Sequence, residues 1–167
     1  MSAGLETMPL SIGARATYSI PKDASDGQLY FGFQGRRRLS RSLGLELSVD
    51  YRSNNYPDLT VIKTSPVQLS LMAYLMPEEV TGMFFLAGCG WYYTQVSGPF
   101  GFNQTYSRIG LHAGVGFELR LIGELSLSAT YRYVWLDSVR SIGANAQDKN
   151  YQDSGSMITT ALNFLFL

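Results

Sequence analysis

Histidine is the side chain best suited to acid–base chemistry near neutral pH, and this chain of 167 residues has only one, His112. A hydrolase built on it would need a serine within hydrogen-bond reach and an acid to orient the ring. If the segments around it pair as neighbouring antiparallel strands, His112 lies near Tyr133 and beside Gly90, with Arg132 and Val134 as inward neighbours. This pairing brings no inward-facing serine close. We therefore predict no catalytic residue and interpret His112 as lining an interior.

Metal and thiol chemistry have no better support in the sequence. No cluster of His, Asp and Glu has the spacing of metal ligands, and Cys89 is the only cysteine. A single cysteine can form no disulfide within the chain and supplies no cysteine metal site. We predict no metal and no cofactor, and we interpret Cys89 as a small apolar residue.

Charged side chains on alternate positions of strand-like segments are more informative. The pairing arithmetic sets Arg15 beside Gln34 and Gln34 beside Glu46, with further charges within reach across a narrow interior. Buried charges persist only when they are paired and hydrogen-bonded, so we predict a closed polar network. Its predicted members are Arg15, Gln34, Glu46, Asp50, His112, Glu118 and Arg132. Two roles remain open for it, a structural plug and a narrow or gated conduit.

The segments that would position these residues alternate apolar and polar side chains. From 109 to 119, for example, the apolar set is Ile109, Leu111, Ala113, Val115, Phe117 and Leu119. Period 2 sustained over nine to eleven residues describes a strand long enough to cross a bilayer at a tilt. The predicted strands span about 10–20, 28–36, 43–52, 66–75, 83–94, 108–120, 125–135 and 156–166.

The cost of exposing charge to lipid decides which face points outward. Placing Arg15 or Arg132 in hydrocarbon would cost about 2–4 kcal/mol each at mid-depth, so the polar set must face the lumen of a membrane barrel. A soluble barrel, oily inside and polar outside, is the alternative. It gains nothing from the many glycines of the polar set, which weaken strands. In the membrane barrel, outward aromatic residues should lie near the interfaces, at Tyr18, Tyr51, Trp91, Tyr93, Tyr133 and Trp135.

The connectors between the predicted strands alternate in length. The long ones are at 21–27, 53–65, 95–107 and 136–155, and the short ones at 37–42, 76–82 and 121–124. Outer-membrane barrels have short periplasmic turns and long external loops, so both termini should be periplasmic. The predicted fold is all-β, an eight-stranded antiparallel up-and-down transmembrane β-barrel spanning 10–167, preceded by an N-terminal extension at 1–9.

Composition agrees with a membrane exterior and excludes one class of partner. Acidic and basic residues balance at 13 each, so nothing points to nucleic acid. Charged residues make up only 16% of the chain, and lysine occurs only at Lys22, Lys63 and Lys149, all in predicted connectors. The N-terminal residues MSAGLETMPL include neither a basic region nor an apolar stretch, so we expect a mature form without a signal peptide.

The densest charge cluster is the run RRRLSR at 36–41. In the predicted topology this run lies at the periplasmic rim. Two interpretations stay open, a solvated turn beside lipid headgroups and a docking site for an acidic periplasmic partner.

Two segments carry a family resemblance, FFLAGCGWYY at 84–93 and RIGLHAGVGFELRLIGELSLSATYRYVWLDS at 108–138. They resemble the second half of the barrel domain of small eight-stranded outer-membrane barrels of Gram-negative bacteria, the broad OmpA/OmpX/OmpW-like group. The resemblance implies an outer-membrane location, with the lipid bilayer and lipopolysaccharide as surroundings, and a possible periplasmic or surface protein partner. It implies a structural, anchoring or surface-recognition role. The alternatives are a conduit for small or apolar solutes and, third, a lipid-modifying enzyme.

Overall fold

The computed structural model describes the backbone of residues 10–22, 27–55, 61–75, 81–98, 101, 103–136, 139–142, 148–151 and 154–166. The extension predicted at 1–9 lies outside the described residues. In the part of the chain that the structure describes, no helix is long and apolar enough to cross a membrane.

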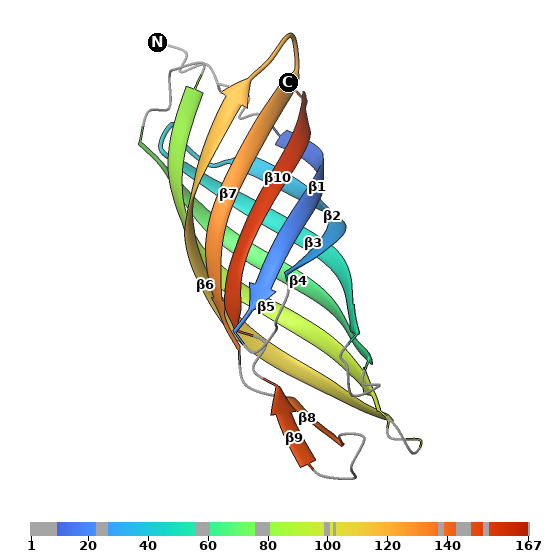
Figure 1. The fold of residues 1–167 in the computed structure, drawn as a ribbon. Coiled ribbons are helices and arrows are strands. Elements are labelled where there is room, and N and C mark those ends of the chain that lie inside the picture. Colours follow the sequence, from blue (N-terminus) through green and yellow to red (C-terminus); the bar gives the residue numbers. More distant parts are fainter. Residues whose placement is uncertain are drawn as a thin grey trace, which may run out of the picture.

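Eight long strands close into an antiparallel barrel in the order β1-β10-β7-β6-β5-β4-β3-β2 (Figure 1), which confirms the predicted fold class. They are β1 (Leu10–Pro21), β2 (Gln28–Arg38), β3 (Leu43–Asn55), β4 (Val61–Tyr74), β5 (Thr81–Ser97), β6 (Asn103–Arg120), β7 (Leu125–Trp135) and β10 (Gly155–Phe166). The first and last strands seal the barrel along their whole length, from Leu10 opposite Phe166 to Pro21 opposite Gly155. Closure leaves no free sheet edge, which is what a sheet in lipid requires.

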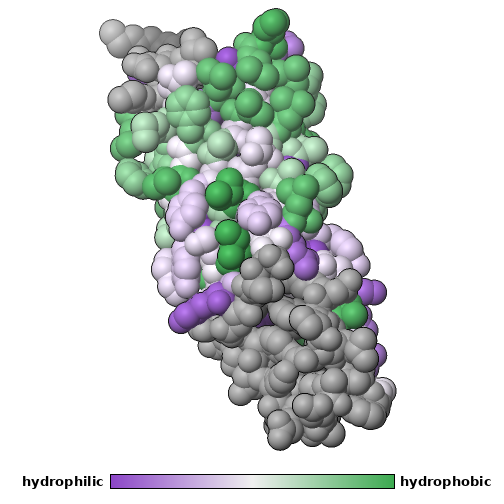
Figure 2. Space-filling view, in the orientation of Figure 1, coloured by the Kyte–Doolittle hydropathy of each residue, from purple (hydrophilic) through white to green (hydrophobic). Residues whose placement is uncertain are grey.

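Alternation separates the two faces of the eight barrel strands over most of their length. Glu46 and Ser128 point into the lumen with exposed fractions of 0% and 1%, whereas Leu47 and Leu127 point outward at 52% and 39%. Among the large apolar residues on the described strands, the most exposed is Ile109 at 78%. A continuous apolar exterior of this size suits hydrocarbon and not water, and the soluble-barrel alternative is therefore wrong. On the face seen in Figure 2, apolar side chains gather over the upper half of the barrel, with paler and more polar side chains below them.

The strand directions sort the connections onto two rims. The turns at 39–42 and 121–124 lie with the start of β1 and the end of β10, at what we call the terminal rim. The β1–β2, β3–β4, β5–β6 and β7–β10 connections lie at the opposite end, the loop rim (Figure 1). This sorting follows the predicted parity of short and long connectors. The connectors themselves are partly outside the described residues.

The strands differ from the prediction mainly at the loop rim, where they are longer. β4 begins at Val61, and β5 and β6 stay paired as far as Ser97 opposite Asn103, within segments predicted as connectors. A further small hairpin, β8 (Val139–Ile142) and β9 (Asp148–Tyr151), lies in the last long connector. Apolar alternation fades where a strand leaves the hydrocarbon, but the backbone hydrogen bonds continue. A pattern search therefore stops too early.

Candidate functional site

The polar lumen is organised around one fully buried carboxylate, Glu46 on β3. Its Oε2 accepts a hydrogen bond from Arg36 Nε of β2 at 2.8 Å, and its Oε1 accepts one from Arg132 Nη2 of β7 at 2.9 Å. A third guanidinium, that of Arg15 on β1, has its Nη1 3.7 Å from the same Oε1. The two shorter distances are those of charge-assisted hydrogen bonds. Glu46 thus ties β3 to three other strands.

Two further carboxylates extend this cluster along the barrel. Toward the loop rim, Asp50 Oδ1 lies 3.0 Å from Arg15 Nε. Toward the terminal rim, Glu118 Oε2 lies 3.8 Å from Arg36 Nη1, and Glu118 Oε1 accepts a hydrogen bond from Ser126 Oγ at 2.8 Å. The structure therefore links Glu46 to Glu118 through Arg36, a residue absent from the predicted network.

Neutral side chains complete the ring of contacts. Arg132 Nη1 donates to Gln68 Oε1 at 3.0 Å, and Gln68 Nε2 donates to the hydroxyl of Tyr92 at 2.5 Å. The side-chain amides of Gln34 on β2 and Asn163 on β10 lie 2.7 Å apart. The Gln34 side chain is buried, and its partner is Asn163 and not Arg15 or Glu46.

Two apolar clusters lie in the lumen, one on each side of Glu46 along the barrel. The cluster near the terminal rim contains Met72, Tyr74, Phe84 and Leu86, and the one near the loop rim contains Tyr92, Val134, Leu136 and Met157. An eight-stranded barrel leaves an interior just wide enough for side chains. Glu46 and Arg132, at the centre of the charged network, have exposed fractions of 0%, so their ion pair is shielded from water.

The predicted pairings between lumen residues are wrong by a register shift of two positions along the strand. In the structure Arg15 lies opposite Gly32, and Gly13 lies opposite Gln34. Glu46 lies opposite Arg36 and not Gln34. The faces are as predicted because a shift of two residues preserves the side on which a side chain points. Turn lengths set the register, and the sequence pattern does not reveal them.

The basic run at 36–41 also divides differently from the prediction. β2 continues to Arg38, so its alternation carries Arg36 into the lumen and leaves Arg37 exposed. The Arg38 guanidinium lies over the ring of Tyr74, 3.6 Å from its centroid. Only the remainder of the run forms the turn at the terminal rim. The alternation of inward and outward residues along β2 continues into the run, and this pattern could have predicted that Arg36 faces the lumen.

His112 has a serine partner that sequence reasoning missed. Its Nε2 lies 2.8 Å from Ser70 Oγ, and both side chains are buried. His112 lies opposite Gly88 of β5, and Gly88 lies opposite Ser70 of β4. The pairing predicted above placed Gly90 there instead. Because Gly88 has no side chain, histidine and serine meet across an intervening strand, which a search among adjacent strands overlooks.

The Ser70–His112 pair lacks the rest of a hydrolytic site. The Nδ1 of His112 has no hydrogen-bond partner among the described residues, and this is the atom that the acid of a triad would orient. Ser70 has an exposed fraction of 0%. The described residues also contain no group of His, Cys, Asp and Glu able to hold a metal ion. Among the described residues, the pair is a buried hydrogen bond between two strands that flank β5.

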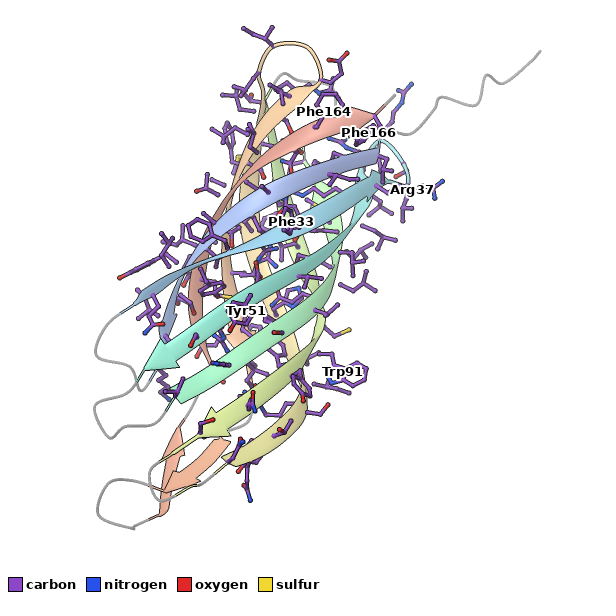
Figure 3. The ribbon with its side chains drawn as sticks, turned by 90° about the vertical axis from the view of Figure 1, so that its right-hand side faces the viewer. Phe33, Arg37, Tyr51, Trp91, Phe164 and Phe166 are labelled. Carbon is purple, nitrogen blue, oxygen red and sulfur yellow. The ribbon has the colours of Figure 1, made fainter. Side chains whose placement is uncertain are left out.

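The six aromatic residues of the predicted girdle all point outward from the barrel. They are Tyr18, Tyr51, Trp91, Tyr93, Tyr133 and Trp135. By strand direction all six lie on the half of the barrel nearer the loop rim, so they form one belt. Near the terminal rim the outward aromatics include Phe164 and Phe166 (Figure 3). Tyrosine and tryptophan prefer membrane interfaces, which predicts a headgroup region at the loop-rim belt.

The chain matches the model of a known protein family. The model of the outer membrane protein beta-barrel domain family matches residues 7–166. A comparison with curated proteins found no match.

Several solved structures have the same fold. The outer membrane protein OprG from Pseudomonas aeruginosa has a TM-score of 0.71 at 16% identity, covering 96% of each chain. The N-terminal β-barrel domain of OprF from Pseudomonas aeruginosa has a TM-score of 0.69 at 11% identity, covering 95% of this chain and 97% of that one. Neisserial surface protein A has a TM-score of 0.67 at 15% identity, with coverages of 96% and 97%. At these identities the likeness concerns the fold alone.

Proposed function

The chain belongs to the outer membrane protein β-barrel domain family, and from that premise we propose that it is a sealed membrane anchor that presents its loop rim at the cell surface. The family implies a bacterial outer-membrane location. The proposed role is structural or surface-recognition, without solute transport and without catalysis. Loops held on a rigid scaffold are a common site of binding, and here the scaffold is the barrel.

The observation that carries this proposal is the filled lumen. Arg15, Arg36 and Arg132 converge on Glu46, and an apolar cluster lies on each side of them. A conduit would need a continuous polar path past these layers. An enzyme would need an accessible nucleophile, whereas Ser70, the serine that is hydrogen-bonded to His112, is fully buried.

The aromatic belt near the loop rim and the exposed arginines at the terminal rim indicate partners for the anchor. We propose lipopolysaccharide as the lipid that meets the loop-rim belt of tyrosine and tryptophan. Arg37 and Arg41 are exposed at the terminal rim, and we propose that a periplasmic partner docking there would be acidic.

Thiol accessibility tests the sealed lumen. In a Cys89→Ser background, Ser48→Cys places a thiol in the lumen, where Ser48 is buried and its hydroxyl makes no hydrogen bond among the described residues. Ser53→Cys, on the outward face of the same strand, is the matched control. With the protein in liposomes and a charged, membrane-impermeant thiosulfonate, we expect Ser53→Cys to react and Ser48→Cys to stay unmodified until the protein is unfolded. Reaction of Ser48→Cys at a rate close to that of the control would establish a water-filled conduit instead.

A further inference from the structure

A hollow interrupts the outer wall of the barrel across the middle part of β3, β4, β5 and β6. Its volume is about 440 Å³, and we call it the wall groove. Its lining residues are Leu47, Val67, Leu69, Cys89, Gly90, Trp91, Ser107 and Ile109. All but Gly90 and Ser107 are outward-facing apolar or sulfur-bearing side chains, so the groove opens toward lipid.

The depth of the groove follows from side-chain size on the β4–β5–β6 ladder. Cys89 is small and lies between Leu69 of β4 and Leu111 of β6. Next to it on the outward face, Trp91 projects away from the wall (Figure 3). The indole Nε1 of Trp91 donates a hydrogen bond to Ser107 Oγ, which fixes the ring as one side of the groove. The small Cys89 side chain beside the hydrogen-bonded indole of Trp91 leaves a hollow that no side chain of the protein fills.

A positive charge lies on the same outward face, closer to the loop rim. Lys63 is exposed and precedes Val67 on β4 by four residues, which at about 3.3 Å per residue places it about 13 Å further along the strand. Its neighbours across the ladder are Ser53 and Gln95, both uncharged. An acyl chain in the groove would therefore have a cation near the level of its headgroup, beyond the interfacial Trp91.

We propose that the wall groove binds one acyl chain of lipid A, with a lipid A phosphate paired to Lys63. Hydrocarbon is the surrounding solvent at this depth, and the charge of Lys63 favours an anionic, phosphate-bearing lipid over a zwitterionic one. The inference rests on the outer-membrane location. It does not depend on whether the lumen is sealed, so thiol accessibility and lipid binding can fail separately.

Native mass spectrometry of the detergent-solubilised protein, with lipid A, phosphatidylglycerol or phosphatidylethanolamine added at equal concentration, tests the groove. Leu69→Trp fills it, and Leu71→Trp is the matched control, because Leu71 has the same outward face and strand and a similar exposed fraction but does not line the groove. We expect one retained lipid A on the wild type and on Leu71→Trp. We expect at least a tenfold loss with Leu69→Trp, and a smaller loss with Lys63→Gln. Heat modifiability on gels checks that each variant is folded.

Several outcomes would overturn the proposal. One is equal lipid A retention by wild type and folded Leu69→Trp. Another is retention of phosphatidylglycerol or phosphatidylethanolamine as strong as that of lipid A, which would mean non-selective annular lipid. A dimer that disappears with Leu69→Trp but not with Leu71→Trp would assign the groove to a second copy of this chain.

Discussion

Glu46→Ala is expected to lower the free energy of unfolding by about 3–5 kcal/mol. The substitution removes the carboxylate that accepts from Arg36 and Arg132 and lies near Arg15, leaving three guanidiniums facing one another in a buried lumen. Total native stability is typically about 5–15 kcal/mol, so the loss is a large fraction of it. Urea unfolding of the protein folded into liposomes, followed by tryptophan fluorescence, measures the change.

Two further variants serve as controls for that measurement. Glu124→Ala removes an exposed carboxylate from the turn at the terminal rim and should change stability by less than about 0.5 kcal/mol. The double variant Glu46→Ala/Arg132→Met should recover part of the loss, because it removes one of the unpaired cations. A Glu46→Ala loss no greater than that of Glu124→Ala would refute the idea that this carboxylate holds the lumen together.

Gly88→Ala is expected to destabilise the barrel by about 1–3 kcal/mol or more. A methyl group at this position would overlap the carbonyl oxygen of Leu69 and come within 2.8 Å of Ser70 Cα, both backbone atoms of the neighbouring strand. Backbone atoms cannot rotate away, so β4 and β5 must separate. The same methyl group would stand between Ser70 and His112.

Gly35→Ala is the control for this effect. A methyl group there finds its nearest neighbour, the Ser11 carbonyl oxygen, at 3.9 Å, an ordinary contact. We expect Gly35→Ala to unfold at nearly the wild-type urea concentration and Gly88→Ala at a clearly lower one. Equal midpoints for the two variants would mean that β4 and β5 have more room than the structure shows.

The sequence predicted faces and topology well because both depend on a period of two. Leu47 outward and Glu46 inward follow from alternation alone, and the placement of the two rims follows from connector parity. The register in which neighbouring strands pair follows neither from alternation nor from connector parity. Arg15 was paired with Gln34 where the structure has Gly32, a slip of two residues that leaves every face unchanged.

Contacts across the lumen were out of reach for a related reason. Ser70 meets His112 over Gly88, and Gln34 meets Asn163, so each contact needs the correct register on more than one ladder. Arg36, at the end of the predicted strand 28–36, was left out of the predicted network because it was grouped with the basic run at the rim. The polar character of the lumen was predictable from sequence, but its partners required the closed barrel.

Single-channel recording of the wild-type protein in planar lipid bilayers tests the sealed lumen most directly. Ions need only a thin continuous water path. We expect none, because the side chains of Glu46, Tyr92 and Arg132 in the lumen have exposed fractions of 0%. We predict a closed barrel with at most small, flickering conductance. Stable, large conductance steps from the folded wild-type protein would contradict the sealed anchor and establish the conduit.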